Sequence, residues 1–352
     1  MTSPLLSFLA LACRAFLPMR RMLLMLVLLA APLSGAADET AKESADPEVS
    51  ILQTVVVSGE QPGPGMWKVS KGEHVLWILG TLNPLPRKME WISRDVEATI
   101  AASQEVILSP GASINVKGGM LGGLFLLPSL IGARNNPDDA RLADVVPADL
   151  YARWVVLKAR YIGRDNGIEK RRPIFASQEL FVEAIKDSGM SLDDVVGKVV
   201  KKAARRNKVA IVEPRVELRI ESARAAVREF KKSELDDIDC FAKTMSRLET
   251  DIEAMKLRAN AWASGDVEAL RSFGYDDQFQ ACSDAVLKAS VAEERGLGDL
   301  RERIARVWLD AAESTLARNP SSFAVLPVRH LLEADGLLAR LRDRGYLVEA
   351  PE

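Results

Sequence analysis

The sequence is poor in the residues and motifs that many enzymes use for covalent or metal-dependent chemistry. Its 352 residues include two histidines and three cysteines. It has no Gly-x-Ser-x-Gly elbow, no Walker phosphate loop and no Cys-x-x-Cys pair, which excludes the usual signatures of serine hydrolases, P-loop NTPases and thioredoxin-like proteins. Its 49 acidic residues nearly balance 47 basic ones. We therefore expect no nucleic-acid partner.

A continuous apolar stretch long enough to cross a bilayer is also missing near the N-terminus. Arg20 and Arg21 precede the apolar run Met22–Ala31, and small residues follow up to Ala36. This run is too short for a membrane anchor, whereas charge, apolar run and small residues together are typical of a secretory signal peptide. We interpret residues 1–36 as a signal peptide and expect a periplasmic or secreted protein without a transmembrane span after cleavage.

Cleavage at that point removes three arginines and no acidic residue, which changes the formal net charge from −2 to −5. It also leaves two cysteines, Cys240 and Cys282. In an oxidising compartment such a pair predicts one disulfide bond, and two buried thiols are the alternative.

The remaining chain divides into a leader and one large domain. Residues 37–65 are polar and then rich in proline and glycine, which predicts a disordered leader and a linker, with 51–57 as a candidate edge strand. The domain, residues 66–352, alternates strand-like and helix-like segments. Strands are expected near 66–69, 75–80, 105–108, 208–213 and 322–326, and helices near 93–103, 147–161, 176–188, 191–206, 238–262, 300–318 and 331–342. We predict an α/β (α+β) fold with a central mixed β-sheet and many surrounding and inserted helices.

Several segments carry more specific expectations. Ser191 to Asp194 has the pattern of a capping box, and apolar residues from Ile238 to Trp262 recur at spacings of three and four, as in one long helix. The cations near Arg206 suit the C-terminal end of a helix rather than a nucleic-acid surface. The glycine-rich apolar stretch 118–132 is interpreted as a buried loop or helical hairpin, with an apolar lid or docking surface as the alternative.

The opening of the domain carries a resemblance. Met66 to Val69 alternates in polarity, a polar turn follows, and His74 to Leu79 is a strand covered on both faces. Trp-Lys-Val followed by Leu-Gly-Thr-Leu-Asn-Pro-Leu-Pro resembles the TraB/GumN family, relatives of the Tiki proteases. The family motif there is Gly-x-x-His, with a histidine that is a candidate metal ligand, and this chain has Asn83 instead.

The C-terminus resembles the same family. A strand is followed by His330-Leu331, then by Asp335-Gly336, and then by Gly345-Tyr346. Two departures weaken the expected metal site: Ser109 stands where the family has an acid at a strand end, and Pro327 stands where it has the glycine before the second histidine. Proline fixes φ and has no backbone N–H, so the turn that positions His330 is restricted.

The residues that remain as candidates for a site are His330, Glu213 and Asn83. A lone histidine at a strand end is more often structural, and Glu213 has the alternative of pairing with Arg215. His74, beside the hairpin turn, is expected on the surface. Asn83 and His330 are expected close together, since each follows a buried strand and the two face one cleft.

The resemblance implies two functions of different classes. In the first, this is an exported TraB/GumN-like protein whose metal-hydrolase site is degenerate, without catalysis or with altered activity, and which binds a small molecule, peptide or protein in the cleft. In the second, it is a metal-dependent, peptidase-like hydrolase. No cofactor is expected in the first case and a divalent metal in the second, with His330 and Glu213 as the residual ligands.

Overall fold

A computed structural model describes residues 60–116, 132–273 and 278–351 of the chain. The expectations for the signal peptide, for the leader as far as residue 59 and for residues 118–131 lie outside this range. Within it, no helix combines the length and the apolar composition needed to cross a membrane.

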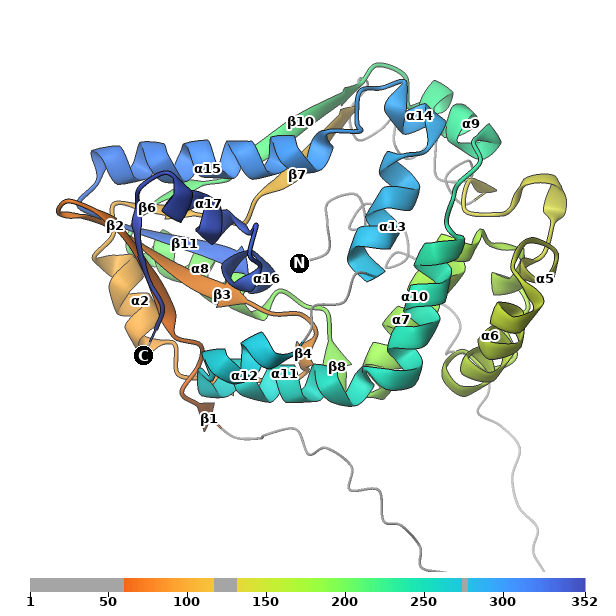
Figure 1. Ribbon diagram of the computed structural model, residues 1–352, viewed down its shortest axis with the longest axis horizontal. Helices are drawn as coiled ribbons and strands as arrows, with labels where there is room; N and C mark the ends of the chain where they lie inside the picture. The colour runs from red at the N-terminus through yellow and green to blue at the C-terminus, as the bar shows by residue number, and fades with distance from the viewer. Residues whose placement is uncertain (1–59, 117–131, 274–277, 352) are drawn as a thin grey trace, which may run out of the picture.

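A six-stranded mixed sheet lies at the centre of the described part of the chain, in the order β12-β2-β3-β11-β6-β9 (Figure 1). Its strands are β2 (Met66–Lys71), β3 (His74–Thr81), β6 (Glu105–Ile107), β9 (Ala210–Val212), β11 (Ser321–Pro327) and β12 (Leu347–Glu349). The strands β3, β11, β6 and β9 are parallel, whereas β2 and β12 run antiparallel to their neighbours. The predicted α/β (α+β) fold with a central mixed sheet is confirmed, and β12 is a sixth strand that we did not assign to it.

The two faces of the sheet are covered by different helices. On one face, Leu76 and Ile78 of β3 belong to a core with α15 (Leu300–Arg318) and α17 (Leu337–Asp343). On the other, Trp77 and Leu79 pack with a core that includes α2 (Arg94–Ala101), α8 (Val195–Arg206) and α11 (Ile252–Ser264). Since successive side chains of a strand point to opposite faces, the apolar run of β3 is explained by burial on both.

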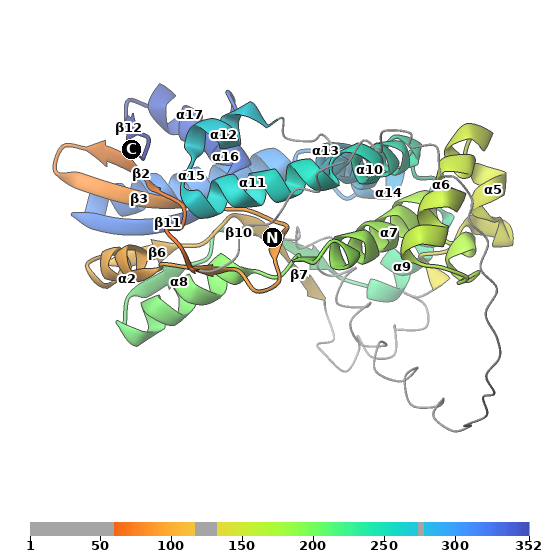
Figure 2. The ribbon, with the colours of Figure 1, turned by 90° about the horizontal axis from the view of Figure 1, so that it is seen from below.

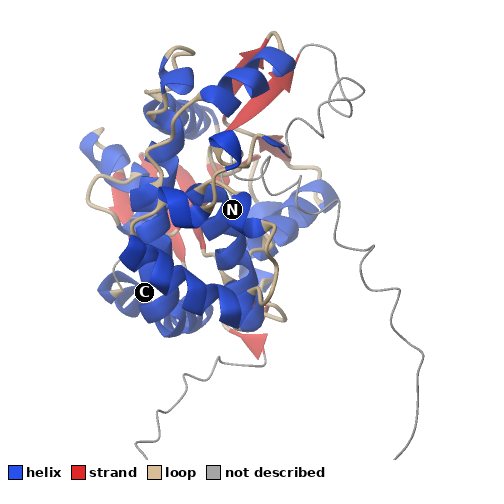
Figure 3. Cartoon of the chain, turned by 90° about the vertical axis from the view of Figure 1, so that its right-hand side faces the viewer, coloured by secondary structure: helices blue, strands red, loops and turns tan. Residues whose placement is uncertain are grey.

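A group of helices extends beyond the sheet, on the right of Figure 1. It consists of α5 (Leu142–Val145), α6 (Ala148–Tyr161), α7 (Pro173–Asp187), α10 (Ile238–Thr250) and α13 (Gln278–Leu287). Trp154 of α6 and Phe241 of α10 are fully buried in its core, with ring centroids 5.6 Å apart. Figure 3 shows how much of the chain is helical around the strands.

The single helix expected over Ile238–Trp262 is in fact two helices, α10 and α11, so that prediction is wrong. They meet at Asp251, whose backbone (φ −110°, ψ −1°) departs from regular helix geometry. Its carboxylate accepts from Arg258 and lies 3.5 Å from Arg247, which holds the joint. The two helices lie along one line in the view of Figure 2 but meet at a steep angle in Figure 1, so the chain bends at this joint although the apolar spacing continues across it.

Two further predictions need correction. The helix expected from Ser191 begins at Val195, since Ser191 lies in the short strand β8 (Met190–Ser191) and Asp194 is the residue whose side chain accepts from the Gly197 amide. The helix expected at 331–342 is split into α16 (Arg329–Leu332) and α17. A Cβ on Gly336 would lie 2.6 Å from the His330 backbone oxygen, so the chain turns there through a glycine. The basic segment 168–173 holds the short helix η2 (Ile168–Lys170) and the buried Glu169 and Arg172.

The remaining elements lie around these layers. The strands β7 (Gly111–Val116) and β10 (Arg215–Ile220) form a separate parallel pair beside α15 (Figure 1). Two small pairs join β1 (Glu60–Gln61) to β5 (Glu90–Trp91) and β4 (Leu85–Pro86) to β8. The other helices are α9 (Ala223–Lys232), α12 (Val267–Ser272), α14 (Ser290–Glu293) and the short η1 (Pro137–Asp139).

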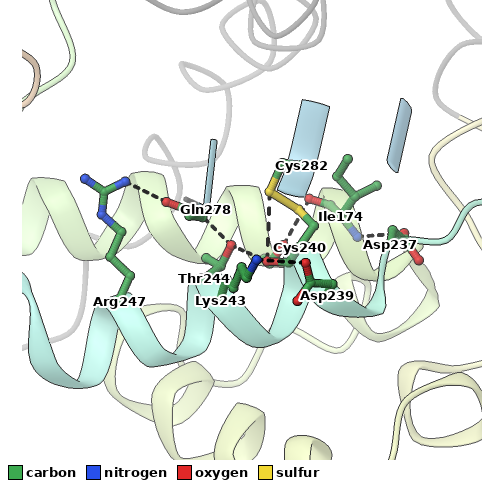
Figure 4. Close-up of a disulfide and its surroundings, with 10 residues drawn as sticks. Ile174, Asp237, Asp239, Cys240, Lys243, Thr244, Arg247, Gln278 and Cys282 are labelled. Atoms are coloured by element: carbon green, nitrogen blue, oxygen red, sulfur yellow. Dashed lines mark hydrogen bonds and ion pairs between the residues drawn. A yellow bond between two sulfur atoms is a disulfide. The ribbon is translucent and has the colours of Figure 1, made fainter. Parts of the chain in front are cut away.

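A disulfide bond between Cys240 and Cys282 joins α10 to α13, as predicted (Figure 4). The Cα atoms lie 4.5 Å apart. A chain of hydrogen bonds runs alongside, in which Arg247 donates to the Gln278 side chain and Gln278 donates to Thr244. The position of α13 against α10 is therefore fixed by covalent and polar contacts together.

Candidate functional site

The residues that follow the four parallel strands lie at one edge of the sheet, which we call the carboxyl edge. Asn83 follows β3, Ser109 follows β6, Glu213 follows β9, and His330 follows β11. The ends of β3 and β11 are joined directly, since the Val328 amide donates to the Thr81 carbonyl at 2.9 Å. In parallel sheets this edge is where ligands commonly bind.

Asn83 is half-buried and is joined to Pro84 by a cis peptide bond. The strand before it is anchored by Trp262, whose indole N–H donates to the Gly80 carbonyl at 2.9 Å. The amide side chain therefore lies at the end of a firmly held strand, as the sequence indicated.

Ser109 is fully buried and its hydroxyl donates to the Val325 carbonyl at 3.1 Å. The bond ties the end of β6 to the neighbouring strand β11. The Ser109 hydroxyl is uncharged, and its proton is donated within the sheet. Ser109 therefore does not supply the negative charge that a carboxylate would bring to this edge.

Glu213 lies at the exposed end of β9. Its side chain is 48% exposed, and its carboxylate accepts a hydrogen bond from Arg215 Nε at 3.1 Å. The strand itself is exposed or half-buried, because β9 (Ala210–Val212), which is shorter than the strand expected near 208–213, is an edge strand of the sheet. Glu213 thus takes part in the surface ion pair that the sequence offered as its alternative.

His330 lies in α16, half-buried, directly after the end of β11. Burial, followed by the positive charges of Arg329 and Arg340, lowers the pKa of His330 to about 3. The imidazole is therefore neutral at physiological pH.

His74 was expected on the surface, but its side chain is not freely exposed. It is half-buried, and its Nδ1 donates to the backbone oxygen of Leu316 in α15. It begins β3, at the end of the strand opposite to the carboxyl edge.

The sequence analysis did not identify the arginines around His330. The Arg329 guanidinium lies 4.2 Å from the ring centroid of Phe279 in α13. Arg340 makes two hydrogen bonds to Glu302, at 3.0 and 2.9 Å, and Arg301 pairs with Asp284. A charged residue shortly after a buried strand is a sequence signal that could have identified Arg329. Its contact with Phe279 could not be predicted in this way, because the aromatic partner lies in another helix.

These residues do not fit a tightly held divalent cation. Among the described residues, no group of three or more histidine, cysteine or carboxylate side chains is placed to hold a metal. At the carboxyl edge Asn83 offers a neutral oxygen, Ser109 is engaged with Val325, and Arg329 and Arg340 add positive charge that repels a cation.

Two hollows lie near this part of the sheet. A small apolar cavity of about 20 Å³ separates the end of β3 from α11 and α16, and Gly80, Trp262 and Leu331 are among its lining residues. It is large enough for about one water molecule. A wider groove of about 450 Å³ is lined by residues near α12, including Asp266, Glu268 and Arg271, and by none of the four residues of the carboxyl edge.

Comparison with known proteins gives one finding. A search of curated proteins and a search of solved structures found no match. The family model of the TraB/PrgY/gumN family matches residues 65–350, which is most of the chain and nearly the whole of the domain described above. It includes both ends of the sequence that carried the resemblance, from the β2–β3 hairpin to β12. The chain therefore belongs to the TraB/PrgY/gumN family.

Proposed function

We propose that this chain is an exported member of the family that binds a ligand or partner at the carboxyl edge of its sheet and has lost, or altered, a metal-hydrolase activity. The observation that carries the proposal is the distribution of charge around His330. Arg329 and Arg340 both disfavour a positive charge at His330, while Ser109 brings no carboxylate to the neighbouring strand end. This environment opposes a bound cation and leaves a binding role as the better explanation.

A metal-dependent hydrolase of the peptidase type is the second candidate. The observation in its favour is that His330 is neutral and partly accessible, which is the state in which imidazole coordinates a metal. Glu213 would have to leave its pair with Arg215 to contribute a second ligand.

Metal analysis of the purified protein distinguishes the two. We expect zinc, manganese and cobalt each far below one equivalent, and no gain from the single variant Asn83→His, since Ser109 still supplies no charge. The wild type carrying near one equivalent of one metal, and the His330→Ala variant losing it, would overturn the proposal. An Arg340→Ala variant is the matched control, because it changes the charge near His330 without removing a ligand atom.

The proposed compartment is the periplasm or the exterior of the cell. The features in its support are the charged, apolar and small-residue segments within residues 1–36 and the disulfide between Cys240 and Cys282, a bond typical of oxidising compartments.

A further inference from the structure

Arg329 is a charged side chain whose contacts with the described residues do not neutralise it. It follows the buried strand β11 and is half-buried. Its guanidinium stacks over Phe279, and among the described residues it makes neither a hydrogen bond nor an ion pair with a carboxylate. A guanidinium has five N–H donors, so this arrangement leaves its hydrogen-bonding capacity unused.

Removing a cation from water without a partner is unfavourable, and cations in protein interiors are normally paired. Burial lowers the pKa of Arg329, and the negative charge of Glu333 opposes this shift without reversing it. Glu333 is itself partly buried, which raises the pKa of its carboxyl group. The chain therefore holds Arg329 in a place where an additional negative charge would be stabilising.

A second arginine strengthens this conclusion. Arg301, at the start of α15, is close enough to lower the pKa of Arg329 by charge repulsion. Its Nε is buried and has no hydrogen-bond partner within the described part of the chain. Its ion pair is with Asp284 of α13, which also lies 3.0 Å from Lys288 Nζ. One carboxylate thus serves two cations, and among the residues that the structure describes positive charge remains in excess beside Arg329.

We propose that Arg329 and Arg301 bind an oxyanion, the carboxylate or phosphate group of a small molecule, where α16 and α15 face α13. The proposal rests on the proposed binding function and names the chemistry of its ligand. A guanidinium presents paired N–H donors that match two oxygens of such a group, and Phe279 holds the plane of Arg329 in one orientation. The excess of positive charge that disfavours a metal at His330 favours an anion here.

The experiment titrates inorganic phosphate and acetate, in separate series, into the purified protein at constant ionic strength set with chloride. Thermal unfolding and the NMR signals of His330, next in sequence to Arg329, are followed together. We expect a saturable rise in the unfolding temperature and a saturable shift of the His330 signals with at least one of the two anions. Phosphate alone identifies a phosphorylated ligand, and acetate alone a carboxylate.

Variants separate binding from a structural role. Arg329→Gln removes the charge and is expected to weaken anion binding by about tenfold or more, the value of a charge-assisted hydrogen bond. Glu333→Gln removes a competing carboxylate and is expected to tighten it. Arg344→Gln, at an exposed arginine that pairs with Glu313 at 2.5 Å, is the matched control and should leave it unchanged.

The Glu333→Gln variant tests the anion site even if Arg329→Gln fails to fold. Loss of stability with no gain in anion affinity means that Glu333 is the partner of Arg329 and that the arginine only joins α16 to α13. Equal responses of wild type and Arg329→Gln to both anions also overturn the inference. Neither outcome contradicts the proposed function. That function is contradicted by a different result, namely near one equivalent of metal in the wild type that is lost in His330→Ala.

Discussion

His330 lies next to one arginine in sequence and near a second one in space, and these neighbours determine its protonation state. Burial is the largest cause of its lowered pKa, and Arg329 and Arg340 act in the same direction. The folded value of about 3 lies below the unfolded value of 6.5, so the neutral form is favoured by folding. Its contribution to stability is complete above pH 6.5 and is lost as the pH falls towards 3.

We expect the imidazole signals of His330 in NMR spectra to stay constant between pH 8 and 5. The chain has two histidines, so a His330→Gln variant assigns the signals by removing one set. A titration of His330 with a midpoint near 6.5 would contradict the burial and charge described for this side chain.

Asp237 shows the reverse case. It is buried, accepts a hydrogen bond from the Ile174 amide at 2.9 Å, and burial raises its pKa to about 6 (Figure 4). Because this lies above the unfolded value of 3.8, the folded protein holds the proton more tightly. Asp237 therefore opposes folding above pH 6, and this effect disappears as the pH falls from 6 to 4.

We expect Asp237→Asn, which keeps an acceptor for Ile174, to raise the free energy of unfolding at pH 8 by up to about 3 kcal/mol. The gain should vanish at pH 4. Denaturant unfolding at the two pH values measures it, and Asp239→Asn, at an exposed residue of the same helix paired with Lys243, is the control. Equal gains at both pH values would show that the charge of Asp237 is not the cause.

At this scale the sequence allowed the positions of Asn83, Ser109 and His330 to be predicted, because each directly follows an apolar strand. It did not allow their chemistry to be predicted. Whether Ser109 donates to Val325, and whether Arg329 meets Phe279, depends on residues from distant segments that only the folded chain brings together.

Among the elements, the start of α8 tests how a helix is capped. Asp194 accepts from the Gly197 amide at 2.8 Å, whereas Ser191 accepts from Asp193 within the preceding turn. We expect Asp194→Ala to lower the free energy of unfolding by about 1 kcal/mol, the usual cost of losing an N-cap. Ser191→Ala should lower the free energy of unfolding much less in the same denaturant titration. A larger loss for Ser191→Ala than for Asp194→Ala would support the predicted capping box that begins at Ser191.

The disulfide links two elements that the chain separates by 42 residues. On the loop-entropy model, closing a loop of that length contributes about 4 kcal/mol. We therefore expect the Cys240→Ala, Cys282→Ala double variant to unfold at a clearly lower denaturant concentration than the wild type. In the wild-type chain without residues 1–36, which has lost Cys13, we expect thiol counting under denaturing, non-reducing conditions to find no free thiol. Two thiols per chain would contradict the bond.

Helices and strands with a continuous apolar pattern could be predicted from the sequence, whereas the breaks between consecutive helices could not. The strands β3 and β11 and the helices α6 and α15 appear where apolar spacing placed them. The break at Asp251 leaves that spacing intact, and the break before α17 depends on the approach of Gly336 to the His330 oxygen. A short strand such as β12 becomes a strand because β2 offers it an edge.

For the molecule as a whole, export is the property that its N-terminus predicts. We expect mass spectrometry of the protein from the periplasm or medium to find an N-terminus near Ala37. Val27→Asp interrupts the apolar run Met22–Ala31 and should leave the precursor uncut inside the cell. Recovery of wild-type protein that begins at Met1 outside the cytoplasm would argue against cleavage.

The layers of the whole molecule were predictable from composition and pattern, but the order of its strands was not. Nothing in the sequence around Ser321 shows that β11 lies between β3 and β6, two strands from the other end of the chain. Nor does it show that β7 and β10 pair apart from the sheet. These pairings depend on which edges remain free once the helices have packed.

The central place of β11 has a consequence for the timing of folding. Ser321 pairs with Val75, so the strand that completes the middle of the sheet is among the last parts to be synthesised. Until it emerges from the ribosome, β3 and β6 have no strand between them, and contacts so distant in sequence form slowly in any case. A nascent chain that ends before Ser321 thus lacks the strand that joins β3 to β6 in the central sheet. Synthesis of β11, rather than emergence of the first hairpin, then sets the moment at which the central sheet can be completed.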